Sequence, residues 1–230
     1  MKTYKDFTRA SSQYLSRANE DALSFHNNFT IGCWVYFDTE STDVDTGIIS
    51  KWYETGNERA YVLYKDSSNI IHFKISNTGA DEYDITDHGI SYQEEQWFYV
   101  VGRFAPQSEL ALFVNGIWFK QVSGIPTDVY HSSEAFEIGR YNRGNYLDGR
   151  VCQAFICGYT VPDRFICSMY AHAKALFMDK FKYPPICTSY VYSASASASA
   201  SISPSASSSA SESASSSASA SASASASAPP

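Results

Sequence analysis

The nine residues Phe29-Thr30-Ile31-Gly32-Cys33-Trp34-Val35-Tyr36-Phe37 decide the fold of this chain. They are rich in aromatic and β-branched residues, which favour strands. Ile31, Cys33, Val35 and Phe37 recur at every second position, the period at which the side chains of a strand point to one face. The stretch therefore predicts a β-strand with one continuous apolar face.

Runs of the same kind recur along the chain, separated by short polar segments. They lie at 47–52, 60–64, 70–75, 97–104, 110–114, 117–122, 135–139 and 149–157. About ten short strands at regular spacing, with turn residues between them, are typical of an antiparallel sandwich. We therefore expect an all-β fold built from two antiparallel sheets.

Two of the connecting segments have the composition of hairpin turns. The polar run Lys65-Asp66-Ser67-Ser68-Asn69 separates two strands. The pair Asn115-Gly116 separates two others, and Asn-Gly favours a type I′ turn because both central residues need a positive φ. Each segment predicts a β-hairpin.

A single stretch has helical periodicity. Met169, Ala173, Leu176 and Phe177 follow Pro162-Asp163 at near-helical spacing, which predicts one short C-terminal helix laid on the sandwich by this face.

The order of the motifs carries a resemblance to a known family. The motifs are Ser12-Gln13-Tyr14-Leu15, the run 29–35, Ile49-Ser50-Lys51-Trp52, the run 96–101, Leu112-Phe113-Val114-Asn115-Gly116, Ile138-Gly139 and Leu147-Asp148-Gly149-Arg150-Val151. In this order they resemble the laminin G-like (LamG type 3) jelly-roll branch of the concanavalin A-like lectin/glucanase superfamily. The resemblance covers roughly residues 7 to 175.

The resemblance implies a double-sheet jelly roll with one concave face, used mostly for binding. Relatives of this kind include carbohydrate-binding modules, adhesins and structural proteins of phage tails and capsids, and some bind Ca²⁺ at a loop end. The last core strand of the family usually carries an Asp soon after its Gly. Here Cys152 stands near that position, so the contribution of that acid is in doubt.

The C-terminal segment differs in composition from the rest. Of the 230 residues, the last 38 contain 20 Ser and 13 Ala, and such a segment buries too little apolar surface to offset its ordering entropy. We therefore expect a LamG-like domain at 1–180, a connector at 181–192 and a disordered Ser/Ala tail at 193–230.

The charge and hydropathy patterns exclude several classes. A net charge of −7 without a basic cluster lacks the electrostatic signature of a nucleic-acid-binding protein. No apolar run approaches the roughly 18 residues of a membrane span. The N-terminal residues 1–7 have no apolar h-region, so we expect no secretory signal peptide.

The five cysteines do not form a metal-binding or redox motif. Cys33, Cys152, Cys157, Cys167 and Cys187 include no C-x-x-C pair. We expect free structural thiols, with one disulfide from Cys33 to Cys157 or Cys152 as the alternative.

The residues of a glycosidase are not recognisable. The superfamily's hydrolases use glutamates spaced E-x-D-x-x-E, and this string does not occur. Glu94 and Glu95 are adjacent and point to opposite faces, while Glu54 and Glu58 lie in a Gly/Asn-rich loop. The five histidines are scattered without metal-ligand spacing. We therefore expect no enzymatic activity.

Calcium is the one cofactor that the sequence suggests. The segment 38–45 holds four acids directly after a predicted strand, and flexible acidic loops can supply the hard oxygen ligands that Ca²⁺ requires. Asp43 and Asp45 are the candidate ligands, although solvated surface carboxylates are the alternative.

Two loops combine aromatic rings with planar polar groups, as sugar binding requires. They are residues 52–59 and 140–146, and the candidate ligand-binding residues are Tyr141, Arg143, Asn145, Tyr146, Trp52 and Asn57. We expect Tyr141, Arg143, Asn145 and Tyr146 to be the best candidates, because loop residues of this type are less needed for packing. Trp52 stands at a strand end and could belong to the core, where mid-strand Trp34 and Trp97 are expected.

These observations favour a non-catalytic module that binds a carbohydrate or another surface, as part of a phage virion or a cell-surface assembly. A structural decoration or fibre protein without a glycan ligand is the alternative, and a degenerate glycoside hydrolase is the third possibility. The expected partner is thus a glycan or a neighbouring structural protein, and the expected location is a virion or the cell surface.

Overall fold

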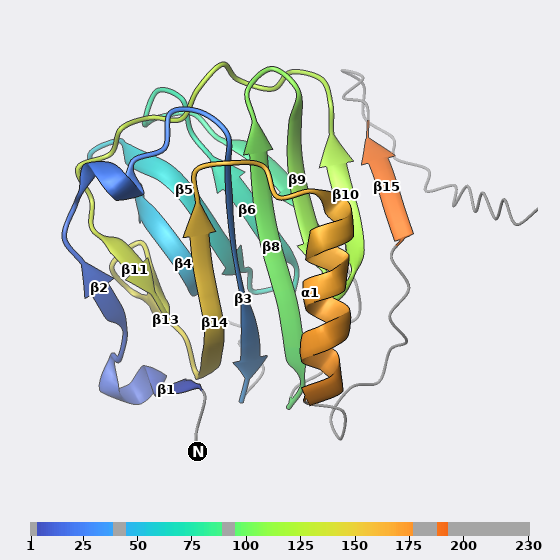
Figure 1. Cartoon of the computed structure of the whole chain (residues 1–230). Helices are drawn as coiled ribbons and strands as arrows, with labels where there is room; N and C mark the ends of the chain where they lie inside the picture. Colours follow the sequence, from blue (N-terminus) through green and yellow to red (C-terminus); the bar gives the residue numbers. More distant parts are fainter. Residues whose placement is uncertain (1–3, 39–44, 89–94, 177–187, 193–230) are drawn as a thin grey trace, which may run out of the picture. The chain divides into compact units, whose positions relative to one another are not determined.

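The computed structural model describes residues 4–38, 45–88, 95–176 and 188–192. They form two stacked antiparallel sheets with a helix on the outer side of one of them (Figure 1). The predicted all-β, two-sheet jelly-roll sandwich is confirmed. The predicted tail at 193–230 lies outside the described residues.

The larger sheet has seven strands. In spatial order they are β1 (Lys5–Phe7), β14 (Gly149–Cys157), β3 (Phe29–Phe37), β8 (Trp97–Ala105), β9 (Glu109–Val114), β10 (Ile117–Gln121) and β15 (Thr188–Tyr192). β15 lies within the predicted connector and pairs with β10 in parallel.

The smaller sheet has six strands. In spatial order they are β2 (Leu15–Arg17), β11 (Phe136–Ile138), β4 (Thr46–Tyr53), β5 (Glu58–Lys65), β6 (Ile71–Ile75) and β7 (Tyr83–Thr86). A separate two-stranded hairpin joins β12 (Arg140–Tyr141) to β13 (Asn145–Tyr146). Two 3₁₀ turns, η1 (Arg9–Ser11) and η2 (Asp21–Leu23), flank β2.

The strand β3 is buried along its whole length because both of its faces are covered. Ile31, Cys33, Val35 and Phe37 belong to the core between the sheets, as the alternation predicts. Trp34 faces the other way and stacks on Tyr170 of the helix, with ring centroids 5.8 Å apart. The sandwich therefore has a second apolar layer between the larger sheet and the helix.

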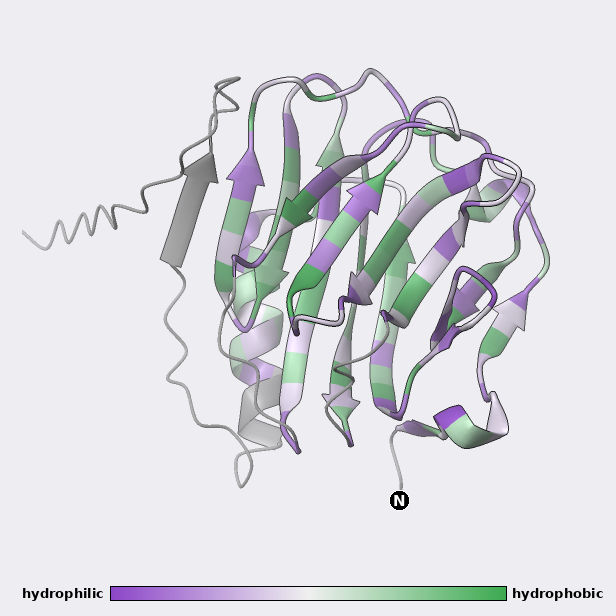
Figure 2. Cartoon of the chain, turned by 180° about the vertical axis from the view of Figure 1, so that it is seen from behind, coloured by the Kyte–Doolittle hydropathy of each residue, from purple (hydrophilic) through white to green (hydrophobic). Residues whose placement is uncertain are grey.

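Within the described residues, no helix covers the outer face of the smaller sheet (Figure 1). Figure 2 looks onto this side and shows hydrophilic and hydrophobic bands alternating along its strands. In β6, Ile71, Phe73 and Ile75 are buried in the core, while His72 and Lys74 between them are half-buried. This face therefore carries the polar side chains from which a site can be built.

Both predicted hairpins are confirmed. Lys65 pairs with Ile71 across the first turn. Val114 pairs with Ile117 across the second, where Asn115 and Gly116 have φ values of 51° and 82°. These positive values are what a type I′ turn requires.

The predicted helix is confirmed as α1 (Asp163–Leu176), but Met169 of its predicted buried face is partly exposed, and the side chains of Ala173 and Leu176 lie outside what the structure describes. Ile166 and Tyr170 are buried, whereas Met169 is 37% exposed. Ionic contacts fix the start of the helix, since Asp163 Oδ1 lies 2.6 Å from Arg103 Nη1 and Asp163 Oδ2 lies 2.7 Å from Lys120 Nζ. Ile166 packs fully against the larger sheet, whereas Met169 contacts it through its sulfur, which lies 3.7 Å from the hydroxyl of Tyr99. Phe177 lies outside the described residues.

The alternative disulfide from Cys33 to Cys157 or Cys152 is wrong. All three thiols are free, and Cys33 faces the inter-sheet core while Cys152 faces the helix layer. Residues on opposite faces of a sheet cannot bring their sulfur atoms together. The expectation of free thiols is confirmed for Cys33, Cys152 and Cys157 and is wrong for Cys167, which is disulfide-bonded.

No helix within the described ranges is long and apolar enough to span a membrane.

Candidate functional site

The β12–β13 hairpin lies against β4, on the outer face of the smaller sheet. A side chain at Gly47 would prevent this approach, because its Cβ would lie 2.3 Å from the carbonyl carbon of Arg140. Ser50 Oγ then donates a hydrogen bond of 2.8 Å to Arg140 O. The missing side chain and this bond together place the hairpin on the sheet.

The hairpin closes over a small aromatic cluster. Trp52, Val62, Tyr64 and Tyr141 pack together and are all buried. The rings of Tyr64 and Tyr141 stack with centroids 4.9 Å apart and an interplanar angle of 22°. The expectation that Tyr141 is a loop residue little needed for packing is therefore wrong. Trp52 is buried as well, which was the alternative considered for it.

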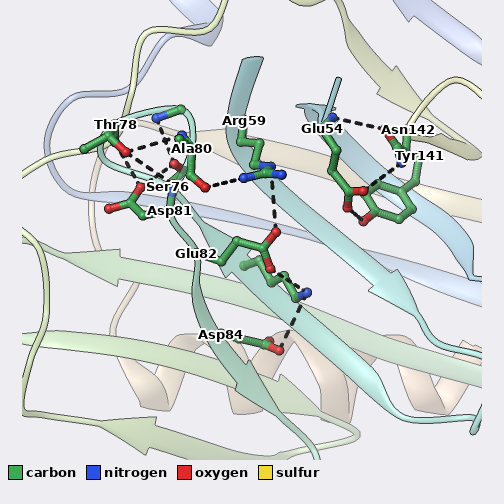
Figure 3. A network of polar contacts seen from close by, with 12 residues as sticks. Glu54, Arg59, Ser76, Thr78, Ala80, Asp81, Glu82, Asp84, Tyr141 and Asn142 are labelled. Atoms are coloured by element: carbon green, nitrogen blue, oxygen red, sulfur yellow. Dashed lines mark hydrogen bonds and ion pairs between the residues drawn. The ribbon is translucent and has the colours of Figure 1, made fainter. Parts of the chain in front are cut away.

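A hydrogen-bonded network joins the hairpin to the β4–β5 turn. The hydroxyl of Tyr141 donates to Glu54 Oε1 at 2.6 Å, and Asn142 Nδ2 donates to Glu54 Oε2 at 3.2 Å. The backbone N–H of Glu54 donates to Asn142 Oδ1 at 3.1 Å (Figure 3). Burial, and then the hydrogen bond and charge of Glu54, raise the pKa of Tyr141. The two loops predicted to form a sugar site are thus locked to each other.

Partly exposed aromatic rings surround the locked hairpin. The guanidinium carbon of Arg143 lies 3.9 Å from the ring centroid of Tyr53. On the other side, the ring of Tyr14 lies 6.0 Å from that of Tyr146, and Arg140 stacks on Tyr14 at 3.7 Å. We call Tyr14, Tyr53, Arg143 and Tyr146 the hairpin rim.

The rim contains two of the predicted residues, Arg143 and Tyr146, and two that sequence reasoning missed. Tyr53 lies inside the segment 52–59, and Tyr14 lies inside the motif at 12–15. The signal that could have identified both is an aromatic residue within one of these segments. Their proximity depends on β2 and β12, which are only three and two residues long.

Of the remaining two predicted residues, one lies in the hairpin and the other in the turn between β4 and β5. Asn145 pairs with Tyr141 in the hairpin and is half-buried beside the rim. Asn57 is exposed in the β4–β5 turn with φ 59°. Its carbonyl packs against the loop at Gly79, where an added Cβ would come within 2.2 Å of it. The structure thus places Asn57 against a different loop.

Ion pairs cover the neighbouring part of the same face. Lys74 Nζ lies 3.0 Å from Glu82 Oε2 and 3.9 Å from Asp84 Oδ2. Arg59 Nε lies 3.7 Å from Glu82 Oε1 (Figure 3). These charges bind one another across β5, β6 and β7.

His72 is held between two carboxylates within this group. Its Nδ1 lies 2.9 Å from Asp84 Oδ2 and its Nε2 lies 3.3 Å from Asp66 Oδ2. Burial disfavours the charged imidazole, but the hydrogen bonds and charges of Asp84 and Asp66 outweigh it, so the pKa of His72 is raised. The ring also stacks on Tyr64 at 4.7 Å, which connects the ion pairs to the aromatic cluster.

This fold and order of motifs match a known family along most of the chain. The model of Laminin_G_3, described as the concanavalin A-like lectin/glucanases superfamily, matches residues 9–163. The chain belongs to the Laminin_G_3 family. No curated protein matches it in sequence.

Solved structures similar to this Laminin_G_3 chain include binding domains of botulinum neurotoxins. The serotype G binding domain superposes with a TM-score of 0.58 at 14% identity, covering 75% of this chain and 42% of the other. The serotype D ligand-binding domain, in complex with N-acetylneuraminic acid, gives 0.55 at 12%, covering 70% and 40%. The DC binding domain, in complex with rat synaptotagmin II, gives 0.54 at 14%, covering 69% and 40%.

These comparisons establish the fold alone. The Laminin_G_3 chain spans less than half the length of the neurotoxin domains that it matches.

The calcium site stays a prediction. Asp43 lies outside the described residues, and Asp45 directly precedes β4. Burial raises the pKa of Asp45 against the opposing hydrogen bond from the backbone of Ser67, and the charge of Asp66 adds to the rise. The described residues contain no group of three or more potential ligands able to hold a metal ion, so a calcium site here needs ligands beyond them.

Proposed function

We propose that this chain is a non-catalytic carbohydrate-binding module that holds its ligand at the hairpin rim. The observation that carries the proposal is the stacking of two of the three rim tyrosines on arginines, Tyr53 on Arg143 and Tyr14 on Arg140. Tyr14 is 37% exposed and Tyr53 is half-buried, and a sugar ring would stack on the exposed part of these rings.

The rim also has the polar groups that sugar hydroxyls need. The side chain of Arg143 is 54% exposed, and its Nη2 lies 2.6 Å from Glu134 Oε1. Asn145, which stands between Arg143 and Tyr146 in the sequence, is half-buried. Guanidinium, carboxylate and amide groups are planar and present fixed donors or acceptors. A few such groups beside aromatic surface give a ligand both orientation and specificity.

Preorganisation supports the same proposal. The Tyr141–Glu54 and Ser50–Arg140 hydrogen bonds hold the hairpin before any ligand arrives. A ligand then loses less free energy to ordering the protein. The neurotoxin domain in complex with N-acetylneuraminic acid supports only the general class, because this chain covers 40% of it.

The state of the candidate glutamates supports a non-catalytic role. Both carboxylate oxygens of Glu54 accept hydrogen bonds from Tyr141 and Asn142. Glu58 Oε2 accepts a hydrogen bond of 2.6 Å from the backbone N–H of Ser133. A glycosidase instead requires an acid and a nucleophile free to flank the scissile bond. Incubation with the bound glycan should release no reducing ends.

A glycan array with the purified chain tests the proposal. We expect binding to at least one glycan class, and we expect Tyr53→Ala and Tyr146→Ala each to weaken it by about tenfold, the effect of losing one aromatic contact of about 1.4 kcal/mol. Tyr159→Ala is the matched control, because Tyr159 is 61% exposed next to the helix. Binding that survives both rim substitutions would place the ligand elsewhere.

One observation favours a second candidate, a structural module without a glycan ligand. Phe165 and Met169 lie four residues apart on α1 and are 53% and 37% exposed, so they form one apolar strip. Such a strip can pack on a neighbouring protein. Two results together would favour this candidate. The chain would bind no glycan on the array, and it would stably bind one structural protein, with this binding lost in Phe165→Ala.

We further propose that the module acts in a virion or at a cell surface. The Ser/Ala composition of 193–230 supports this setting, because segments of such composition can act as spacers between a binding module and its support. Mass spectrometry of purified particles and of cell-surface fractions tests it, and recovery solely from the cytosol would contradict it.

A further inference from the structure

Two of the five histidines face each other on the surface. The rings of His26 and His131 lie with centroids 5.2 Å apart and perpendicular planes. Both side chains are exposed, and they come from segments separated by a hundred residues of sequence. Histidine spacing along the chain therefore did not reveal this pair.

The ring nitrogens of this pair have no partner among the described residues, where no hydrogen bond or ion pair involves either imidazole. Other histidines differ in this respect. His72 lies between two carboxylates, and His172 Nδ1 is 2.8 Å from Ser168 O. The adjacent pair thus retains the nitrogen lone pairs that a metal ion requires.

A buried ammonium group holds the two segments together. Lys51 Nζ donates to Asn19 Oδ1 at 2.8 Å, on the first segment, residues 19–26, which ends at His26. It also donates to Ser132 O at 2.5 Å and to Glu134 O at 2.7 Å on the second. Lys51 is fully buried, so this link fixes the separation of the segments.

The backbones beside both histidines are also anchored. Tyr61 donates its hydroxyl to Leu23 O at 2.9 Å, and Phe25 stacks on Phe29 at 5.5 Å. On the other segment, the N–H of Tyr130 donates to Ser76 O at 2.7 Å and Ser132 Oγ donates to Glu58 O at 2.9 Å. The imidazoles are therefore mounted on fixed supports, as preorganised metal ligands are.

We propose that His26 and His131 form a binding site for a divalent transition metal such as Zn²⁺, Ni²⁺ or Cu²⁺. Imidazole nitrogen is a preferred ligand of these ions. The described residues offer no group of three or more such ligands, so the remaining coordination positions hold water or a donor from a bound partner. This site is separate from the expected calcium site, which would use carboxylate oxygens.

Calorimetric titration of the full chain with Zn²⁺ tests the site, in a Cys157→Ser background because Cys157 is a free, partly exposed thiol. We expect one equivalent of Zn²⁺ to bind. His26→Ala and His131→Ala should each weaken Zn²⁺ binding by at least about tenfold. Removing a residue that only supports a metal ligand already weakens metal binding by about this factor, and these substitutions remove a ligand itself. The double variant should be little weaker than either single variant, because one remaining imidazole no longer chelates.

Two further measurements keep the test decisive. His172→Ala is the matched control and should bind Zn²⁺ unchanged, since His172 is exposed on α1. Electron paramagnetic resonance with Cu²⁺ should show two nitrogen ligands in the parent and one in each single variant. Equal Zn²⁺ affinity in the parent and both single variants, an effect of only one substitution, or no binding by the parent would overturn the proposal.

Discussion

The phenolic hydroxyl of Tyr141 lies 2.6 Å from the carboxylate of Glu54, joining two hairpins that are 87 residues apart in sequence. One hairpin belongs to the smaller sheet and the other lies on top of it. The bond closes an aromatic cluster beneath it and leaves the hairpin rim partly exposed around it. The same contact thus stabilises the fold and positions the candidate site.

Removing this hydroxyl should destabilise the protein measurably. Tyr141→Phe keeps the stack on Tyr64 but deletes a hydrogen bond to a carboxylate, so we expect a loss of about 1.5–3 kcal/mol in the free energy of unfolding. Urea denaturation measures it. Tyr159→Phe, at an exposed position, should change the stability by less than about 0.5 kcal/mol. Equal values for the two variants would show that the bond contributes nothing.

Adding a methyl group at Gly47 should displace the hairpin. The new Cβ of Gly47→Ala would lie 2.3 Å from the backbone of Arg140, so we expect a destabilisation of about 1–3 kcal/mol and weaker glycan binding, although no rim residue changes. Gly144→Ala is the matched control, because its Cβ would meet nothing closer than 4.0 Å. Thermal denaturation and the glycan array together test this, and unchanged binding by Gly47→Ala would argue against a preorganised rim.

The stability should depend on pH through His72. Its pKa is raised in the folded state by Asp84 and Asp66, which outweigh the effect of burial. Its contribution is therefore complete below the unfolded pKa of about 6.5 and is lost as the pH rises through the folded pKa. Between about pH 6 and 8, a range that begins near the unfolded pKa of histidine, the melting temperature of the parent should therefore fall. We expect this fall to be larger than that of His72→Gln over the same range. His172→Gln serves as the control, and parallel curves for parent and His72→Gln would contradict the assignment.

The free thiols should react in a defined order. Cys33 is fully buried and burial raises its pKa, while burial raises the pKa of Cys152 to about 11. Cys157 is partly exposed. Because the thiolate is the reactive species, iodoacetamide should modify Cys157 first and Cys33 only on unfolding. Peptide mass spectrometry follows the order, and early modification of Cys33 would show that the inter-sheet core opens.

The long strands and both turns were predictable because their signals are local. The alternation in 29–37 and the Asn115-Gly116 pair each describe neighbouring residues, and the structure confirms both. The helix was also predictable, but its buried face was not. The start of the helix is held by ion pairs of Asp163 with Arg103 and Lys120, and these partners lie on strands distant in sequence.

The candidate site was predictable as two loops and not as a surface. Composition drew attention to 52–59 and 140–146, yet Tyr141 and Trp52 are buried while Tyr14 and Tyr53 join Arg143 and Tyr146. Whether these residues bind a ligand stays a prediction. The short strands β2, β12 and β13 carry too few residues for a periodic pattern, so their positions depend on neighbours such as Gly47.

By itself, the sequence determined an all-β sandwich, because strand periodicity and turn chemistry act between residues close along the chain. Tertiary structure alone decided which side chains meet across it. The contact between Tyr141 and Glu54, the facing rings of His26 and His131, and the orientation of α1 all join distant segments. Such contacts form only after packing has paid the entropy of closing long loops, and no local pattern records them.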